Sequence, residues 1–371
     1  MPKIVLTNVT KQWGKFIGVN NLNLEIEDGS FVTLLGSSGC GKTTTLRMIA
    51  GLETPTTGEI RFDDKIVFSS EKNINIPPAK REVGFLFQNY ALWPHMTVYQ
   101  NIAFGLETLK WKKNEIKDRV AEMLKIMRIE QFAERYPAEL SGGQQQRVAI
   151  ARTLAPKPRV LFMDEPLSNL DAKLRGEMRT ELKRLHKDTA STFVYVTHDQ
   201  QEAMTLSSKI CMMNEGVLQQ YASPLEVYNH PANLFVADFV GNPSMNIIEA
   251  KAKKIGHAAA EIELLGRKTL FQASEDFELE SENVSVGIRP EFLPISPAGD
   301  IEGMAYSTLP AGMETTVKIK VGDTILSSVV FGAIDYEADA IIHFSVSGSG
   351  ILLFDRKSGQ NISIGHLAVQ K

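Results

Sequence analysis

The feature that most constrains the fold is a mostly apolar segment, Phe31–Leu35, that runs directly into a glycine-rich loop. The loop reads Gly36-Ser37-Ser38-Gly39-Cys40-Gly41-Lys42-Thr43 and fits the pattern G-x-x-x-x-G-K-[ST] in full. Its glycines let backbone N–H groups approach phosphate oxygens, and the helix that should follow adds a favourable dipole. Lys42 is expected on the β- and γ-phosphates and the Thr43 hydroxyl on Mg²⁺. We therefore expect an α/β fold whose strand–loop–helix unit binds a nucleoside triphosphate.

Two adjacent carboxylates, Asp164 and Glu165, follow a second apolar segment, Arg159–Met163, with the pattern of a buried parallel strand. A carboxylate at the end of such a strand can hold Mg²⁺ through its water shell, which is the role expected for Asp164. Glu165 is placed to orient or deprotonate an attacking water. An Asp-Glu pair in this position is usually a solvated strand end, but the phosphate loop in the same chain favours the catalytic interpretation.

Two more polar residues follow apolar segments. His198 comes after Phe193–Thr197, on the edge where open α/β sheets bind ligands, and could hydrogen-bond a γ-phosphate. A histidine at a strand end can equally be a surface or capping residue, and chemistry alone leaves both alternatives open. Gln88 follows Val83–Phe87; its amide could ligate Mg²⁺ and position water, although glutamine is also a common surface residue.

A second polar, glycine-rich turn, Leu140-Ser141-Gly142-Gly143-Gln144, precedes an apolar helical segment that should end before Pro156. Ser141 and the glycine N–H groups at the start of a helix make another anion site. The chain has one triphosphate to bind, and its own phosphate loop already holds it. This second site is therefore most simply explained if it acts on a nucleotide held by another copy of the chain.

Length and charge narrow the class of protein. With 371 residues the chain should form two domains, and 40 Lys+Arg against 44 Asp+Glu gives a net charge of −4, without the basic surplus that indicates nucleic-acid binding. Cys40 and Cys211 are too few for a disulfide framework or a thiolate metal site, which favours a reducing compartment. The start lacks the layout of a signal peptide, and no apolar run approaches the roughly 18 residues that span a bilayer. Any membrane role should therefore come through a partner.

The pattern changes after Pro243 to short alternating segments such as Val317–Val321 and Ile351–Phe354, bounded by turn residues. This pattern predicts an all-β, barrel-like domain. We expect a nucleotide-binding domain at 1–238 and the β-barrel domain at 239–371. Apolar residues at helical spacing from Ile116 to Met127 predict a helical subdomain at about 90–155 within the first of them.

Taken together, the ordered motifs resemble the ATP-binding-cassette (ABC) transporter ATPases over roughly the first 240 residues. The motifs are Gly36–Thr43, Gln88, Leu140–Gln144, Asp164-Glu165, Ser168-Asn169-Leu170-Asp171 and His198. Two further stretches, 88–98 and 239–246, resemble the maltose and multiple-sugar import branch, to which glycerol-phosphate importers also belong. Gly287–Glu291 resembles a motif of that branch's C-terminal regulatory domain, which is built from small barrels of the oligonucleotide/oligosaccharide-binding (OB) type.

The resemblance implies a P-loop NTPase core with an antiparallel β subdomain and a helical signature subdomain, followed by an all-β OB-type regulatory domain. It also implies that the chain binds ATP and Mg²⁺. The residues that it places on ATP are Trp13, Gly36, Ser37, Ser38, Gly39, Cys40, Gly41, Lys42, Thr43, Thr44, Ser141, Gly142, Gly143, Gln144 and Asp171.

Within this set the resemblance implies distinct roles. Trp13 would stack on adenine, whereas an apolar surface tryptophan would otherwise be given a structural role. Ser141 and Gly143 would act in trans on the ATP of a partner subunit, and Asp171 would lie across the dimer interface. The catalytic residues would be Glu165, His198 and Gln88, and the metal ligands would be Thr43, Gln88 and Asp164.

The resemblance also implies partners. These are a second ATPase subunit, as a homodimer or close heterodimer, two integral membrane permease subunits and, indirectly, an extracytoplasmic solute-binding protein. The aromatic stretch Tyr90–His95 would receive a cytoplasmic permease helix, although these residues alone fit a core-contacting loop equally well. The chain would lie peripherally at the cytoplasmic face of the inner membrane.

The implied function is ATP hydrolysis that drives uptake of a carbohydrate or related polyol. Import of glycerol-phosphate, polyamines or anions is an alternative, and so is a non-transport ABC ATPase. The segment Leu309–Thr316 departs from the leucine-glycine turn expected in sugar-importer relatives. An altered effector site and neutral length variation both fit this departure, so the solute and any regulator of the C-terminal domain stay open.

Overall fold

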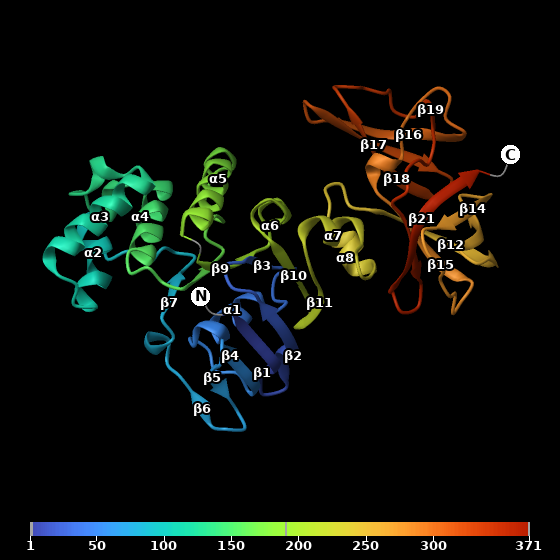
Figure 1. Ribbon diagram of the computed structural model, residues 1–371. Coiled ribbons are helices and arrows are strands. Elements are labelled where there is room, and N and C mark those ends of the chain that lie inside the picture. The colour runs from blue at the N-terminus through green and yellow to red at the C-terminus, as the bar shows by residue number, and fades with distance from the viewer. Residues whose placement is uncertain (1–2, 190, 370–371) are drawn as a thin grey trace. The chain divides into compact units, whose positions relative to one another are not determined.

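The structure is a computed structural model that describes residues 3–189 and 191–369 (Figure 1). The chain divides into two compact units, Met1–Pro224 and Leu225–Lys371. We describe each unit by itself.

A six-stranded sheet in the order β11-β10-β3-β9-β8-β7 forms the centre of the first unit. Every residue of its three middle strands is buried, as expected for parallel strands with helices on both faces. The strands are β3 (Phe31–Leu35), β7 (Val83–Leu86), β8 (Val160–Asp164), β9 (Thr192–Thr197), β10 (Lys209–Asn214) and the antiparallel edge strand β11 (Val217–Ala222). Because β3, β9, β8 and β7 are parallel neighbours, their carboxyl ends meet at one edge.

A second, antiparallel sheet in the order β2-β1-β4-β5-β6 lies beside α1 (Figure 1). Its strands are β1 (Ile4–Trp13), β2 (Phe16–Ile26), β4 (Thr57–Phe62), β5 (Lys65–Ser69) and β6 (Ile74–Asn75), and the 3-10 turn η1 (Pro78–Lys80) follows. Helix α1 (Lys42–Ala50) packs between the two sheets, since Leu46 and Ile49 share one apolar cluster with Leu24 and Leu34. Gly51, in the left-handed conformation, ends this helix where the sequence predicted.

Three helices form the helical subdomain of the first unit. They are α2 (Val98–Thr108), α3 (Lys113–Met127) and α4 (Gly142–Leu154), with short 3-10 turns η2 (Glu130–Phe132) and η3 (Pro137–Glu139) between them. Thr97 and Ser141 begin α2 and α4 with capping boxes, because each accepts from the backbone N–H three residues later. The apolar residues Val120 and Val148 join Leu161 and Phe193 of the parallel sheet in one core. Helices α5 (Ala172–Thr189) and α6 (Gln200–Leu206) follow β8 and β9.

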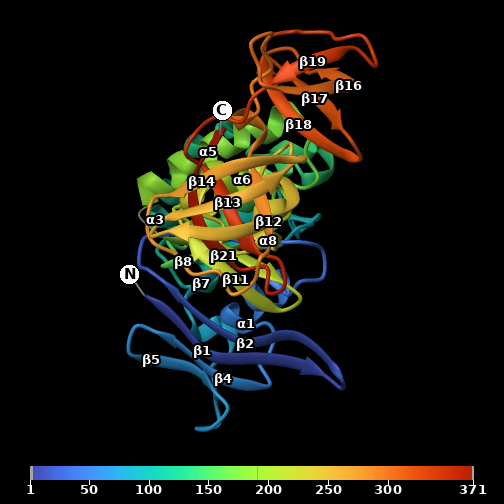
Figure 2. The ribbon, with the colours of Figure 1, turned by 90° about the vertical axis from the view of Figure 1, so that its right-hand side faces the viewer.

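The second unit contains the all-β region that the sequence predicted. It begins with the short helices α7 (Pro224–Asn229) and α8 (Leu234–Phe239). A closed barrel follows (Figure 2), made of β12 (Asn246–Gly256), β13 (Ala259–Leu264), β14 (Arg267–Ala273), β21 (Asn361–Val369), β20 (Ile351–Asp355) and β15 (Asn283–Ile288). A separate four-stranded sheet contains β18 (Thr324–Phe331), β17 (Glu314–Val321), β16 (Ile301–Pro310) and β19 (Ile341–Phe344), and η4 (Pro290–Phe292) lies against β18.

The division between the units falls at the start of α7, between Pro224 and Leu225, N-terminal to the boundary expected at 238/239. Hydrogen bonds explain this difference. The Leu234 N–H donates to the Gly359 carbonyl at 2.8 Å, and the buried Arg289 guanidinium donates to the carbonyls of Tyr228 (2.7 Å) and Val240. These contacts attach α7 and α8 to the barrel, and they join residues that are far apart in the sequence.

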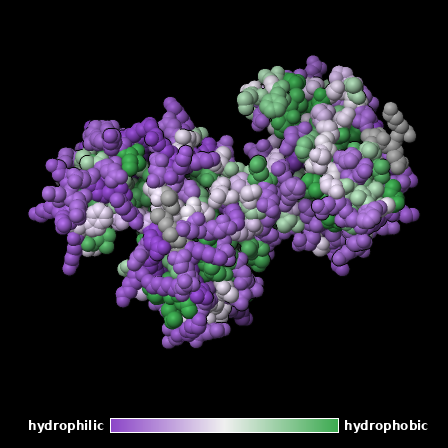
Figure 3. Space-filling model, in the orientation of Figure 1, coloured by the Kyte–Doolittle hydropathy of each residue, from purple (hydrophilic) through white to green (hydrophobic). Residues whose placement is uncertain are grey.

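The segment that departs from the expected turn, around Gly312, joins β16 to β17. Gly312 has a φ of 92°, which favours glycine, and Gly332 donates its N–H to the Met313 carbonyl at 2.9 Å. Leu309, Met313 and Phe331 are exposed here, and Figure 3 shows apolar side chains at the tip of this sheet. The segment that departs from the expected turn therefore lies at an exposed end of the four-stranded sheet.

A half-buried histidine on α5 is expected to make the stability of the first unit depend on pH. His186 Nε2 lies 3.0 Å from the Gly29 carbonyl oxygen, and its ring packs edge-on against Phe31 and Phe193. Burial among these side chains lowers the pKa of His186 below its ordinary value of 6.5. Below that pH the unfolded chain takes up a proton before the folded chain does, so stability falls as the pH drops.

We expect His186→Gln to lack this pH-dependent contribution to the free energy of unfolding. The glutamine amide can still donate a hydrogen bond to the Gly29 carbonyl. The measurement is the urea midpoint of wild type and variant at pH 7.5 and at pH 5.5. The wild type should lose more stability than the variant between the two values. Equal losses would show that His186 does not contribute to the pH dependence.

Candidate functional site

The phosphate loop wraps around the end of Lys42 at the start of α1. Lys42 is buried, and its Nζ donates to the carbonyls of Gly36 (2.8 Å) and Ser37 (2.7 Å). Gly41 has a φ of 99°, and a Cβ there would lie 2.5 Å from the Gly18 carbonyl oxygen of β2. Only glycine fits this conformation and this close approach. The result is a positive charge inside a glycine loop at a helix N-terminus, an arrangement that binds phosphate.

Thr43 and Asp164, which come from distant parts of the sequence, meet at the end of β8. The Thr43 Oγ1 hydroxyl donates to Asp164 Oδ1 at 2.8 Å, and the Asp164 side chain is almost completely buried. The other carboxylate oxygen, Oδ2, lies 3.3 Å from Nη2 of Arg47. Hydroxyl and carboxylate oxygens are ligands that Mg²⁺ prefers, so this pair fits the predicted metal site.

Arg47 is a site residue that the sequence reasoning missed. It lies four residues after Thr43 on α1, so the helical repeat places both side chains on one face. That spacing was a usable signal. The sequence could not show that Asp164, at the end of β8, lies against the same face of α1.

Glu165 and His198 form the next part of the site. Glu165 has a φ of 45°, a left-handed conformation that is costly for a residue with a side chain, and its N–H donates to the Val196 carbonyl at 3.0 Å. His198 Nδ1 lies 3.3 Å from Glu165 Oε2. The strained turn therefore directs the carboxylate toward the histidine that follows the neighbouring strand β9.

Gln88 joins this group through Ser168. Gln88 Nε2 donates to Ser168 Oγ at 3.4 Å, and Ser168 Oγ donates to the Glu165 carbonyl at 2.9 Å. Asn169 Nδ2 in turn donates to the Gln88 carbonyl at 3.4 Å. The structure thus brings Gln88, Glu165 and His198 together at the edge of the parallel sheet. A carboxylate beside a histidine and an amide can activate and orient a water molecule.

Trp13 lies at the end of β1, on the antiparallel sheet. Its ring packs over Gly18, where a Cβ would come within 2.5 Å of the indole, and it stacks on Phe16 with ring centroids 6.2 Å apart. Gly18 also approaches Gly41 of the phosphate loop, so Gly18 lies between Trp13 and that loop. Its side chain is 44% exposed, so a planar base could stack on it.

The second glycine turn begins α4. Ser141 is the N-cap, and its Oγ accepts from the Gln144 N–H at 3.4 Å. Figure 1 shows α4 grouped with α2 and α3 and apart from α1. The structure therefore does not bring Ser141, Gly142, Gly143 and Gln144 to the phosphate loop of the same chain.

The two glycines of this turn differ in their surroundings. A Cβ on Gly143 would lie 2.3 Å from Leu174 Cδ2 on α5, whereas a Cβ on Gly142 would meet open space. Asp171 N-caps α5 in the same place, accepting the Leu174 N–H at 2.9 Å. Gly143 and Asp171 are thus neighbours through Leu174.

We expect Gly143→Ala to lower the free energy of unfolding by about 1 to 3 kcal/mol, because Leu174 must move to make room. Gly142→Ala is the matched control and should change it by less than about 0.5 kcal/mol. Urea unfolding without nucleotide separates this packing effect from any effect on ATP. Equal losses in the two variants would contradict the packing role of Gly143.

The aromatic stretch after Gln88 is held in place by Arg152. The Arg152 guanidinium donates to the carbonyls of Tyr90 (2.7 Å) and Ala91 (2.6 Å) and lies 4.7 Å from the centre of the Trp93 ring. Trp93 in turn packs against Phe104 of α2 at 4.3 Å between ring centroids. Phe87 and Phe104 are partly exposed beside it. This stretch is an ordered, partly apolar surface near Gln88.

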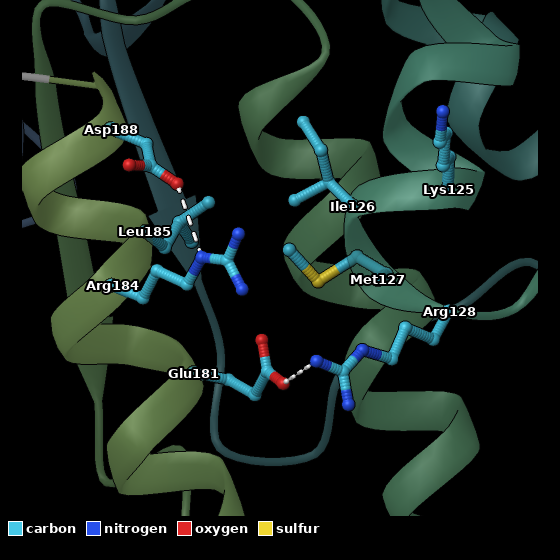
Figure 4. Close-up of a pocket in the computed structure, with 8 residues that line it drawn as sticks. All are labelled: Lys125, Ile126, Met127, Arg128, Glu181, Arg184, Leu185 and Asp188. Carbon is cyan, nitrogen blue, oxygen red and sulfur yellow. Dashed lines mark ion pairs between the residues drawn. The ribbon is translucent and has the colours of Figure 1, made fainter.

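A hollow between α3 and α5 is separate from this site (Figure 4). Arg128 and Glu181 face one another across it at 3.5 Å, and Arg184 pairs with Asp188 at 3.6 Å along α5. Its lining residues are Lys125, Ile126, Met127, Arg128, Glu181, Arg184, Leu185 and Asp188, and none of them belongs to the phosphate loop or the carboxylate pair. Among the described residues, no helix is both long and apolar enough to cross a membrane.

Comparison with known proteins agrees with this geometry. Residues 19–168 match the family model of the ABC transporter. The chain is 44% identical over 349 residues to the trehalose/maltose import ATP-binding protein MalK of Thermococcus litoralis, covering 94% of this chain and 89% of that one. It is 45% identical over 327 residues to the maltose/maltodextrin import ATP-binding protein MalK of Escherichia coli K12, covering 86% of each.

Solved structures support the same assignment for the first unit. The ATP-binding cassette MJ0796, solved as a dimer in a post-hydrolysis state bound to ADP and Pi, is 34% identical with a TM-score of 0.52. It covers 60% of this chain and 98% of its own. The cbiO1 protein of Clostridium perfringens, part of the ABC transporter complex cbiONQ, is 30% identical with a TM-score of 0.55. On this sequence identity over nearly the full length, together with the geometry of the site, the chain belongs to the ABC transporter ATPases.

Proposed function

We propose that this ATPase drives the import of a sugar, most simply maltose, trehalose or a related oligosaccharide. The observation that carries the ATPase part is the meeting of Glu165, His198 and Gln88 beside the Thr43–Asp164 pair. The solute class rests on the relatives, which are named as maltose and trehalose import proteins and align over both units of this chain.

In the proposed mechanism the phosphate loop, from Gly36 to Thr44, binds the triphosphate of ATP. Lys42 neutralises the β- and γ-phosphates, and Trp13 stacks on the adenine. Thr43, Asp164 and Gln88 would hold Mg²⁺, which would neutralise the charge that develops on the transferred phosphoryl group. The hydroxyl–carboxylate contact at 2.8 Å supports this ligand set, because the two oxygens already face one another.

Glu165 acts as the general base in this proposal. It takes the proton of a water that attacks the γ-phosphate, and Gln88 orients that water. His198 holds the Glu165 carboxylate and donates a hydrogen bond to the γ-phosphate. The left-handed backbone at Glu165 supports the assignment, because strain of this kind persists where the surrounding structure needs one side-chain direction.

We propose that two copies of the chain close on two ATP molecules. Ser141 and Gly143 of one copy would contact the γ-phosphate held by the other, and Asp171 would link the two sites. The separation of α4 from α1 within one chain supports this arrangement, as does the dimeric state of the related cassette MJ0796. Hydrolysis removes the γ-phosphate contacts, so the dimer reopens.

The proposed partners are two membrane permease subunits, with a solute-binding protein on the far side of the membrane. The Arg152-held stretch Tyr90–His95 is the proposed docking surface for a permease helix, which places the ATPase peripherally at the cytoplasmic face of the inner membrane. Closure of the dimer would then move the docked helices and switch the side to which the pathway opens. The β-barrel unit is proposed as a regulatory domain.

Co-expression with the permease subunits tests this function. The ATPase rate of the complex in proteoliposomes is measured with the solute-binding protein and maltose, trehalose, glycerol 3-phosphate or a polyamine. We expect stimulation by maltose or trehalose. Stimulation by another solute would replace the sugar assignment. ATPase activity that is independent of the permease subunits but is stimulated by DNA would overturn the transporter function.

A further inference from the structure

Arg175, in the first turn of α5, lies between two loops of the proposed catalytic site. Its Nη2 donates to the Leu170 carbonyl at 3.1 Å, at the end of the segment Ser168–Asp171. Its Nη1 lies 3.2 Å from Oδ2 of Asp199, the residue that directly follows His198. One planar guanidinium therefore connects the loop that carries Asp171 with the loop that carries His198.

A buried carboxylate, Glu202, lies beneath the Arg175 guanidinium that connects the two loops. Glu202 Oε2 accepts the hydroxyls of Tyr195 and Thr197, each at 2.7 Å, and the side chain is 3% exposed. Its other oxygen, Oε1, faces Arg175 Nε at 3.9 Å. This Nε is buried without a hydrogen-bond partner among the described residues. Burial raises the pKa of Glu202, and the hydroxyl donors and Arg175 oppose that change.

Asp199 connects Arg175 to the backbone at the start of α6. Its Oδ1 accepts the Glu202 N–H at 3.0 Å and so caps α6, while Oδ2 faces Arg175. The Asp199 N–H donates to Thr197 Oγ1 at 3.0 Å. The segment around His198 is therefore fixed to β9, and Arg175 supplies its connection to α5.

The neighbour of Arg175 in the chain, Leu174, is the residue that packs against Gly143. The first turn of α5 thus touches three segments that were singled out from the sequence. These are the second glycine turn, which contains Gly143, the loop ending at Asp171 and the loop of His198.

We propose that Arg175 is a positioning residue that fixes His198 relative to the Ser168–Asp171 segment, and thereby relative to Glu165 and the partner's nucleotide. This inference rests on the proposed function of those residues. A guanidinium suits the role because its donors lie in one rigid fork, so two bonds set both distance and orientation. Since Arg175 does not belong to the phosphate loop, its loss acts on turnover and leaves ATP affinity unchanged.

The test uses the full-length protein with Arg175→Met and Arg175→Lys. Displacing a catalytic group by about 1 Å from its productive position can lower the rate about 10²-fold. We expect both variants to lower kcat by about 10- to 100-fold, with KM for ATP changed less than about twofold. The lysine variant keeps the charge but lacks the fork. Full activity in Arg175→Lys would overturn the positioning role.

A double-mutant cycle with Asp199→Asn shows whether Arg175 acts through Asp199. Asparagine keeps an oxygen for the α6 cap but removes the charge that faces Arg175. We expect the double variant to have a kcat no lower than that of the worse single variant. Multiplying effects would show that the two residues act independently and would overturn the inference.

Two controls keep the outcomes separate. Arg184→Met removes an exposed arginine from the same helix and should leave kcat unchanged. Glu165→Gln is assayed in parallel. If it turns over normally, the proposed role of Glu165 as general base fails, whatever the Arg175 variants show. If it is inactive while Arg175→Met has the wild-type kcat, only the inference about Arg175 fails. If circular dichroism shows that Arg175→Met is unfolded, the kcat values of Arg175→Lys and Asp199→Asn still test whether Arg175 positions His198.

Discussion

Glu165→Gln is expected to bind ATP with wild-type affinity, to remain as an ATP-bound closed dimer and to hydrolyse ATP at least about 10²-fold more slowly. The amide has the size of the carboxylate and can still contact His198, whose Nδ1 lies 3.3 Å from Glu165 Oε2. It cannot accept a proton from water. The variant therefore removes the proposed general base and preserves the rest of the site.

The measurements are a single-turnover hydrolysis assay, an ATP-binding titration and the mass of the protein with ATP by light scattering. The matched control is Glu181→Gln, because Glu181 is a similarly buried carboxylate that pairs with Arg128 in the hollow between α3 and α5. The control should hydrolyse ATP at the wild-type rate. Wild-type turnover in Glu165→Gln would rule out Glu165 as the base.

Arg81→Met is expected to lower the free energy of unfolding by about 3 to 5 kcal/mol. The buried Arg81 guanidinium donates to the carbonyls of Met48 (3.0 Å) and Ile49 (2.8 Å) at the end of α1, and to those of Ile76 (2.7 Å) and Val67 (3.4 Å). Methionine fills a similar volume but leaves these carbonyl oxygens buried without donors. A positive charge at the C-terminus of the phosphate-loop helix is lost as well.

Burial lowers the pKa of Arg81 to about 10, so the group stays charged at neutral pH and the effect should be constant between pH 6 and pH 8. The control is Arg159→Met, which removes an exposed arginine 3.5 Å from Asp63 and should cost less than about 1 kcal/mol. Urea unfolding of both variants gives the comparison. A loss below about 1 kcal/mol for Arg81→Met would mean that solvent or another donor replaces the guanidinium.

Much of the site could be predicted from short stretches of sequence. The strand before Gly36, the helix after Lys42 and the capping box at Ser141 depend on residues within a few positions of one another, and the structure has each of them. The strand ends at Asp164 and Thr197 were equally visible, because fully buried parallel strands are continuous apolar runs. The order of the sheet then placed Glu165 beside His198.

The residues that support the site could not be predicted in this way. Arg81 and Arg175 are ordinary basic residues in the sequence, and their roles depend on acceptors 33 and 24 positions away. The clash that reserves Gly143 for glycine comes from Leu174 on another helix. The attachment of α7 and α8 to the barrel depends on Arg289, which again reaches carbonyls that no local pattern indicates.

The sequence by itself determined the phosphate loop, the carboxylate pair, the buried strands and the change to a β-rich second part. Local backbone preferences and hydrophobic periodicity are properties of neighbouring residues, so they can be read along the chain. Only the tertiary structure decided which arginine meets which carbonyl or carboxylate and where the two units divide. It also decided why a Cβ at Gly143 would meet Leu174 while a Cβ at Gly142 would meet open space. Those features depend on side chains brought together by packing, and their sequence separation carries no signal of the contact.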